Sequence, residues 1–371
     1  MKDSHWDETV DRPWIGKAEA AGRSCLYRLG AALLGGLPAV AGRPARPFDM
    51  GAVKKILLIK EPYRMGDLFQ VTPTLRALKN WRKDIILGLV IQDRNLPVFR
   101  DNPRLDRLHV YRKRELNGAP WKIFSFLRGI RREKYDLAVT LETQRTHLTN
   151  DLIALFSGAP YRLRQDGAPF GNPGSNAFYN LLSPVDGGAA HQVDKNFSVF
   201  APYGIRLENR SLEFFVPDDD LASAKEILQA LGAPLPSIAI HPGSYKLANR
   251  WPLASYLGVA QVLRDKGMKG VFVLGPSESD WRGEIEKAGF PVVSGVSITE
   301  MAGIFRLSGA VLCNDTGVMH IAGAVGARTV ALFGRTEPDE WKPPGDAVRF
   351  LRAPDKNIAS IPAERVLEAL S

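Results

Sequence analysis

An acid, a hydroxyl residue and a glycine stand in a row within the segment CNDTGVMHIAGAVG (313–326), and a histidine follows three residues later. The first turn of a helix presents free backbone N–H groups and the positive end of the helix dipole, and together these bind phosphate. Asp315 and Thr316 stand where such a helix would begin, and Gly317 would let a phosphate approach the backbone closely. Beside the ordinary role of Asp315 or Thr316 as a helix cap, the segment therefore indicates a phosphate site. His320 would either touch the phosphate or brace the turn.

Asp-Thr-Gly is also the active-site triplet of aspartic proteases. Those enzymes are all-β and need two carboxylates that face each other. This triplet occurs once and leads into a segment of helical length, so the protease reading has little support.

A second loop with binding chemistry is HPGSYKLANRWP (241–252), which follows another apolar run. Ser244 belongs to an exposed turn, and Lys246 and Arg250 bring positive charge beside a helix start marked by proline. A solvated basic loop is the ordinary alternative, because surface lysines and arginines are common. Its position next to the phosphate loop favours a role in binding an anion.

Two acids follow other apolar runs. Glu278, in LGPSESD (274–280), is placed to accept hydrogen bonds from ribose hydroxyls, and Asp67 follows Gly66 at the turn after KKILLIK (54–60). Asp67 has a simple alternative role as a helix cap. A carboxylate across a cleft from a phosphate site is nevertheless the arrangement of a transferase, with a base for the acceptor and a cradle for the leaving diphosphate.

The elements that must position these residues alternate between strand and helix in two blocks. In the first block we expect strands over 54–60, 84–91, 106–111 and 135–142, with helices over 67–81 and 119–134. In the second we expect strands over 237–243, 270–276, 291–296, 310–315 and 329–334, with helices over 220–232, 252–267, 279–289, 297–309 and 317–326. This pattern predicts the α/β class with two doubly wound domains that bind ligands at the carboxyl ends of their strands. The Gly/Pro/Asn-rich region 158–190 predicts a loop or flap.

Bulk properties limit the function. The 371 residues exceed what one hydrophobic core usually serves, and the net charge of +9 favours an anionic partner. Charge alone does not choose among nucleic acid, a membrane surface and a phosphorylated substrate. Two cysteines, with no cluster of Cys and His, argue against a disulfide framework or a zinc site and fit a reducing cytosol.

The N-terminal region contains an apolar stretch, 29–42, that is flanked by arginines. It is shorter than the roughly 20 apolar residues that span a bilayer. Two readings stay open: a helix that lies at a membrane surface, or a helix packed on the main body. Residues 43–52 read as a linker.

These residues carry a resemblance to glycosyltransferase family 9, the ADP-heptose:lipopolysaccharide heptosyltransferases. The matching pieces run in order from about residue 53 to 344: ILLIKEPYRMGDLFQVTPTLRALK, HQVDKNF, AIHPGSYKLANRWP, FVLGPSESD and LSGAVLCNDTGVMHIAGAVGARTVALFGRTEPDEWKPP. The resemblance implies a GT-B fold, in which two Rossmann-like domains face each other across a cleft. It divides the chain into an N-terminal extension (1–50), an acceptor domain (51–217), a nucleotide-sugar domain (218–350) and a C-terminal helix that returns to the first domain (351–371).

The resemblance also implies an activity: inverting, metal-independent transfer of heptose from ADP-heptose to an inner-core sugar of lipopolysaccharide, with no cofactor. Asp67 matches the general base of the family. Asp315, Thr316, Gly317 and His320 match its Asp-x-Gly-x-x-His turn, in which backbone N–H groups hold the leaving diphosphate and the aspartate touches the sugar. We expect the enzyme in the cytoplasm, peripheral at the inner face of the inner membrane.

The remaining site residues are carried over in the same way. Glu278 is the best match for the acid that holds ribose, Ser244 lies in the loop for the donor diphosphate, and Arg64, Met65 and Gly66 belong to the first loop. The family often has lysine where this chain has Asn249. The phosphate-binding cation is therefore either Lys246 or Arg250.

The basic charge fits an anionic glycolipid acceptor. Residues 104–134, in the first domain, hold ten Lys and Arg against three Asp and Glu. Nucleic acid is the competing partner, but no motif for RNA or DNA binding is present. Two alternative functions remain: transfer of another sugar or to another acceptor on the same scaffold, and binding of a nucleotide sugar without turnover.

Overall fold

The computed structural model describes residues 47–60, 64–112, 115, 119, 121–170, 173–232 and 238–371. Most of the expected N-terminal extension, including the apolar stretch 29–42, lies outside these residues. None of the helices within these ranges is long and apolar enough to cross a membrane.

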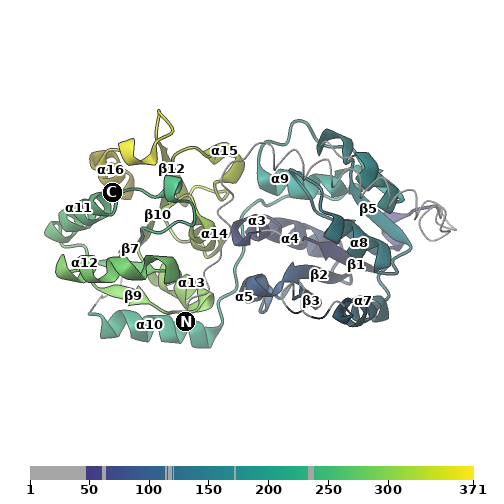
Figure 1. The fold of residues 1–371 in the computed structure, drawn as a ribbon, viewed down its shortest axis with the longest axis horizontal. Helices are drawn as coiled ribbons and strands as arrows, with labels where there is room; N and C mark the ends of the chain where they lie inside the picture. Colours follow the sequence, from purple (N-terminus) through teal and green to yellow (C-terminus); the bar gives the residue numbers. More distant parts are fainter. Residues whose placement is uncertain are drawn as a thin grey trace.

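Two parallel sheets form the centres of two domains that lie side by side in Figure 1. In the described part of the chain each sheet has six strands. The first contains β1 (Lys55–Ile59), β2 (Ile86–Gln92), β3 (Arg107–Tyr111), β4 (Leu137–Thr140), β5 (Tyr161–Gln165) and β6 (Leu181–Ser183). The second contains β7 (Ile238–His241), β8 (Gly270–Leu274), β9 (Val292–Ser294), β10 (Ala310–Asn314), β11 (Thr329–Phe333) and β12 (Val348–Arg352).

Both sheets have the same strand order. The first runs β3-β2-β1-β4-β5-β6 and the second β9-β8-β7-β10-β11-β12, which is the doubly wound Rossmann order in each case. The order reverses between β1 and β4 and between β7 and β10, so ligands are expected beyond the carboxyl ends of these strands. The predicted α/β class is confirmed.

The predicted loop over 158–190 is wrong, because β5 and β6 lie within it. β5 has the sequence YRLRQ, and its two arginines, Arg162 and Arg164, are buried. Buried arginines replace the apolar residues by which a central strand is recognised. β6 has only three residues, which is too short for a pattern to show. β12 at the edge of the second sheet was also not expected.

The helices of the first domain are α3 (Met65–Phe69), α4 (Thr72–Trp81), α5 (Leu96–Phe99), α7 (Lys122–Glu133), α8 (Leu148–Phe156) and α9 (Gln192–Phe197). The single helix expected over 67–81 is two helices, and the first begins at Met65 within the expected loop. Pro73 has no N–H to donate to the carbonyl of Phe69. The Thr72 hydroxyl donates to that carbonyl instead, at 2.8 Å, and the chain changes direction there.

The helices of the second domain are α10 (Asp218–Ala230), α11 (Leu253–Asp265), α12 (Arg282–Lys287), α13 (Ile298–Leu307), α14 (Gly317–Ala324), α15 (Pro338–Trp341) and α16 (Ala363–Leu370). Local signals set several of their ends. The Ser297 hydroxyl accepts the N–H of Glu300 at 3.0 Å, and the Glu300 carboxylate accepts the N–H of Ser297 at 2.8 Å, which is a capping box.

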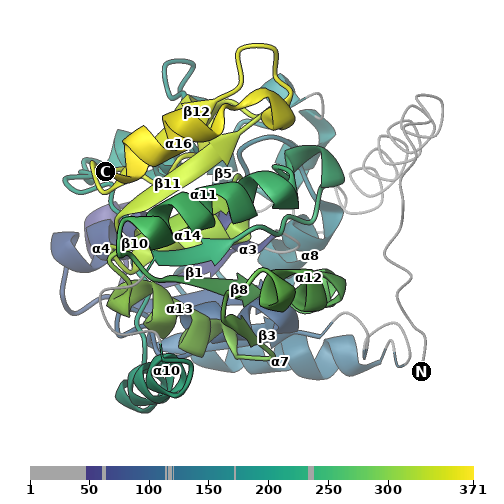
Figure 2. The ribbon, with the colours of Figure 1, turned by 90° about the vertical axis from the view of Figure 1, so that its left-hand side faces the viewer.

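The C-terminal helix does not follow the expectation that it returns to the first domain. α16 packs on α11 and on β11 and β12 of the second sheet, and Figure 2 shows it lying beside α11. Val366 and Leu370 are buried in one apolar cluster with Tyr256, Val259 and Leu263. Burial of these side chains against α11 fixes the helix on the second domain.

The two domains meet at several places in the middle of the molecule, among them α5 against α13 (Figure 1). α3 of the first domain packs against α14 of the second. Nearby, α9 reaches α15: Gln192 and Lys195 donate to the carboxylate of Glu340 at 2.8 and 2.7 Å. The helix expected to carry the base and the helix expected to hold phosphate are therefore neighbours.

Candidate active site

The turn after β10 has the geometry of an anion site. Thr316 is the N-cap of α14 in extended conformation, and its side chain makes no capping hydrogen bond. The first-turn N–H groups of α14 therefore lack the side-chain acceptor that usually satisfies them. A Cβ placed on Gly317 would lie 3.0 Å from Cε of Met65, so a larger residue would press against the first domain.

Asp315 is held in place by a neighbouring loop. Its carboxylate accepts a hydrogen bond from Nδ2 of Asn249 at 3.0 Å. Burial raises the pKa of Asp315 above its ordinary value, and Thr336 and Lys246 partly offset that shift. Asn249, where the resemblance implies a lysine, thus orients the acid that precedes α14.

The expected ribose acid and one of the two expected cations form an ion pair. Arg250 donates to the Glu278 carboxylate at 3.1 Å and to the carbonyl of Ser244 at 2.7 Å. The Glu278 side chain is 3% exposed, and a Cβ on Gly243 would lie 2.4 Å from its carboxyl carbon. Only glycine lets this carboxylate lie against the loop after β7. Lys246, by contrast, is exposed.

Asp67 lies in the short helix α3 at the end of β1. It is half-buried, and its carboxylate accepts the N–H of Arg64 at 3.2 Å. It is the third residue of the helix and not its N-cap, but its bond to the N–H of the N-cap Arg64 is one half of a capping box, so the carboxylate also caps the helix. Burial raises the pKa of Asp67, while the positive charges of Lys60, Arg64 and Arg145 lower it.

Lys60 is a buried cation beneath this helix. The side chain lies at the end of β1, is 1% exposed, and donates to Oδ1 of Asn196 at 2.6 Å and to the carbonyl of Leu141 at 3.2 Å. Burial lowers its pKa to about 8, against the opposing effects of Asp67 and Glu142. At neutral pH the ammonium group remains mostly protonated and stabilises the ionised form of Asp67.

His320 braces the contact between the two helices. Its Nδ1 lies 3.2 Å from Nε2 of Gln70, and a Cβ on Gly66 would lie 2.8 Å from its Cδ2. Burial, together with the charge of His191, lowers the pKa of His320 to about 3. The imidazole is therefore neutral at physiological pH and joins α14 to α3. Of the two roles left open by the sequence, bracing is the one that these contacts support.

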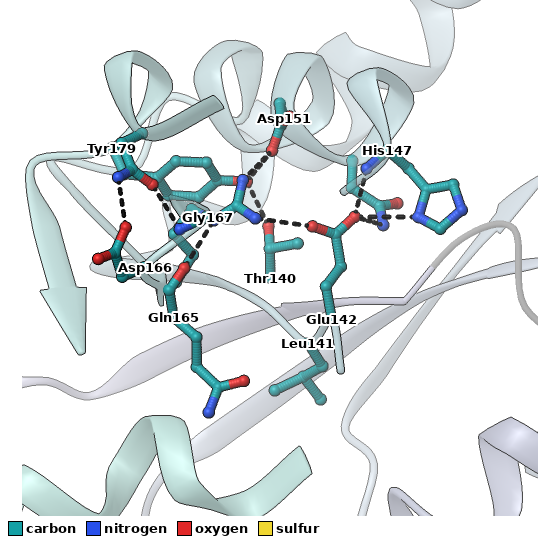
Figure 3. A network of polar contacts seen from close by, with 12 residues as sticks. Thr140, Leu141, Glu142, His147, Asp151, Gln165, Asp166, Gly167 and Tyr179 are labelled. Atoms are coloured by element: carbon teal, nitrogen blue, oxygen red, sulfur yellow. Dashed lines mark hydrogen bonds and ion pairs between the residues drawn. The ribbon is translucent and has the colours of Figure 1, made fainter. Parts of the chain in front are cut away.

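A buried network supports the loop after β4 (Figure 3). Arg164 donates to Glu142 and to Asp151, both at 3.1 Å, and these three side chains are at most 2% exposed. Glu142 also accepts from the N–H of His147 at 2.8 Å, and Tyr179 donates to Asp151 at 2.6 Å. Glu142 also acts electrostatically on Lys60, whose charge in turn lowers the pKa of Asp67.

The structure brings the sequence-predicted residues to one region from both domains. Arg64 lies 5.3 Å from the ring centre of Tyr245, which stands between Ser244 and Lys246, and Met65 and Gly66 contact α14. Sequence reasoning missed Lys60 and the role of Asn249. The signal for Lys60 was present: a lysine ends an otherwise apolar strand one loop before Asp67.

Comparisons with known proteins agree with this geometry. The model of "Glycosyltransferase family 9 (heptosyltransferase)" matches residues 123–369. Lipopolysaccharide heptosyltransferase 3 of Escherichia coli is 23% identical over 287 residues, which cover 75% of this chain and 83% of the relative. Lipopolysaccharide heptosyltransferase 1 of Pseudomonas aeruginosa is 22% identical over 297 residues, covering 76% and 79%.

Solved structures show the same architecture. The glycosyl transferase family 9 protein of Veillonella parvula superposes with a TM-score of 0.74 at 21% identity, covering 88% of this chain and 98% of that one. ADP-heptose lps heptosyltransferase II of Escherichia coli superposes with a TM-score of 0.69 at 21% identity, covering 85% and 97%. With the family model spanning most of the chain and both doubly wound sheets in place, this chain belongs to glycosyltransferase family 9 and is a glycosyltransferase of the GT-B fold.

Proposed function

We propose that this enzyme transfers heptose from ADP-heptose to an inner-core acceptor of lipopolysaccharide, with inversion and without a metal ion. The observation that carries the proposal is the contact of α3, which holds Asp67, with α14, whose first turn has no side-chain cap. The curated relatives are lipopolysaccharide heptosyltransferases, and a heptosyltransferase of this fold was solved with ADP-2-deoxy-2-fluoro heptose.

In the proposed reaction the acceptor hydroxyl attacks the anomeric carbon of the donor from the face opposite the diphosphate. Asp67 takes the hydroxyl proton as the new carbon–oxygen bond forms. The bond between the anomeric carbon and the diphosphate oxygen breaks, and ADP leaves with the electron pair. A single displacement of this kind inverts the anomeric configuration.

The leaving diphosphate would be stabilised by the chain itself. The backbone N–H groups of Thr316 and Gly317 and the dipole of α14 face developing negative charge. Asp315 would contact the sugar, and Glu278 the ribose. A diphosphate that approaches Gly317 must meet or displace the Met65 side chain, which supports a contact between the first loop and the donor.

The acceptor would be an anionic glycolipid, and the enzyme would work in the cytoplasm at the inner face of the inner membrane. The basic surface of the first domain supports the anionic acceptor and the membrane location, because an anionic acceptor is steered toward positive charge. The donor is a substrate, so no separate cofactor is proposed.

A panel of nucleotide sugars tests the donor assignment. The enzyme is incubated with each donor and a truncated lipopolysaccharide core, and the products are measured by mass spectrometry. We expect a product from ADP-heptose and none from donors of other sugars. A product from a hexose donor alone would show that the same scaffold transfers another sugar.

Replacement of Lys246 and of Arg250 separates phosphate binding from stabilisation of the buried Glu278. We expect Lys246→Ala to weaken ADP binding about tenfold, as loss of one charge-assisted contact does, and to leave the melting temperature unchanged. Arg250→Ala leaves the buried Glu278 without its cation, so it should weaken binding and also destabilise the protein. Calorimetry and thermal melts measure both effects. Unchanged ADP affinity in Lys246→Ala would leave Arg250 as the phosphate cation.

Removal of the Lys60 charge should move the pH dependence of the reaction. Lys60 lowers the pKa of Asp67, so Lys60→Met should raise that pKa and shift the acidic limb of kcat/KM about one pH unit upward. Lys60→Arg keeps the charge and serves as the control. If the acidic limb of Lys60→Met coincides with that of the wild type, Lys60 does not act on the base.

A further inference from the structure

The outer face of α7 carries two large apolar side chains that nothing in the described structure covers. Trp121, the N-cap residue, is 68% exposed, and Phe124 is 73% exposed. They are three residues apart, so they lie on the same face of the helix. Two neighbouring exposed rings form a contiguous apolar patch, and patches of this kind mark interaction sites.

Positive charge continues along the same face of α7, and Trp121, Phe124, Arg128 and Arg132 together are called the stripe. Arg128 and Arg132 follow Phe124 at spacings of four residues, and both are exposed. Within the described part of the chain neither forms an ion pair. The nearby acids are engaged by other cations: Glu115 with Arg112 and Lys122, and Glu133 with Arg107. The stripe therefore presents aromatic rings at one end and free guanidinium groups at the other.

The opposite face of α7 fixes this orientation. Ile130 is fully buried, and the Phe126 ring packs edge-on against Tyr111 of β3 with ring centres 5.6 Å apart. Rotation of the helix to hide Trp121 and Phe124 would expose these residues. The stripe is thus a stable feature of the surface, on the edge of the first sheet formed by β3.

We infer that the outer face of α7 docks on an anionic lipid bilayer. Aromatic rings flanked by arginines are the composition of interfacial helices: the rings enter the boundary between headgroups and acyl chains, and the arginines meet lipid phosphates. Each arginine near such a surface contributes about as much as a fivefold change in affinity. The biological role of this docking rests on the proposed function. The domain that carries α7 also carries Asp67, and a lipid-anchored acceptor is presented at the membrane.

The experiment is vesicle flotation with the full chain. The vesicles are phosphatidylcholine alone and phosphatidylcholine mixed with phosphatidylglycerol. We expect binding only to the anionic vesicles, weakened at least 25-fold by Arg128→Glu with Arg132→Glu and about tenfold or more by Trp121→Ala with Phe124→Ala. Matched controls are Leu182→Ala, 48% exposed on β6 at the opposite sheet edge, and Lys225→Glu with Lys266→Glu, exposed on the second domain. Both should bind as the wild type does.

Turnover of a lipid-free acceptor by the same variants separates membrane docking from acceptor binding. For Trp121→Ala with Phe124→Ala we expect it to stay within about twofold of the wild type, because these two side chains lie outside the site residues and outside the basic charge assigned to the acceptor. A matching fall in that turnover would make the face an acceptor site and overturn the inference. So would equal binding to neutral vesicles, or loss of binding on deletion of residues 1–46 while the α7 variants bind normally. Vesicle binding is measurable without any sugar transfer, so failure of the proposed reaction would be seen separately.

Discussion

Asp67→Asn should lower kcat by about a thousandfold and leave ADP affinity within about twofold of the wild-type value. The amide keeps the shape of the side chain but cannot take the proton from the acceptor hydroxyl. Apart from the contact with Met65, the residues expected to hold ADP lie in the second domain, in the loops after β7, β8 and β10, whereas Asp67 lies in α3 of the first. Turnover by mass spectrometry and ADP binding by calorimetry measure the two quantities on the same preparation.

The control for this variant is Asp93→Asn, which makes the same change at an exposed position after β2 of the same sheet. It should have wild-type turnover. Full activity in Asp67→Asn would remove Asp67 as the base. A parallel loss of ADP binding would instead show that the substitution disturbs the contact between α3 and α14.

Arg164→Met should destabilise the protein by about 3–5 kcal/mol, because it leaves two buried carboxylates without their cation. Arg164 is 1% exposed and bonds both Glu142 and Asp151. A loss of this size is a large share of the stability of an ordinary domain. Urea denaturation followed by circular dichroism measures the change.

The matched control is Arg282→Ala, which removes a surface pair with Glu286 in which both side chains are 49% exposed. Exposed pairs contribute less than about 1 kcal/mol, so the control should unfold close to the wild type. Adding Glu142→Gln and Asp151→Asn to Arg164→Met should restore part of the lost stability, because no buried charge then remains unpaired. Equal stability of Arg164→Met and the wild type would contradict the account of this network.

The sequence predicted the fold well where strands are uniformly apolar. β1, β2, β7 and β10 come close to this, and the segments that follow three of them hold Asp67, Ser244 and Asp315. It failed at β5, where the buried Arg164 is stabilised by acids from other elements. Pairing between distant residues leaves no local pattern, so a buried ionic network cannot be seen in one sequence.

The candidate site was also only partly predictable from the sequence. The residue types and the helix start at Gly317 predicted the phosphate turn from the sequence. The hydrogen-bond partners of its side chains could not be predicted from residue spacing. The contact of His320 with Gln70 joins residues 250 positions apart in different domains. The position of α16 was wrong for a related reason: the resemblance suggested one domain, and its apolar face at Val366 and Leu370 matches the other.

The most direct test of the account is the structure of the product formed from ADP-heptose and a truncated lipopolysaccharide core. Mass spectrometry should show the addition of one heptose, and NMR of the new anomeric centre should show the configuration opposite to that of the donor, with or without a chelator. Asp67→Asn should form almost none of this product. A product of retained configuration, or the absence of transfer from ADP-heptose by a preparation that binds ADP, would contradict the proposed reaction.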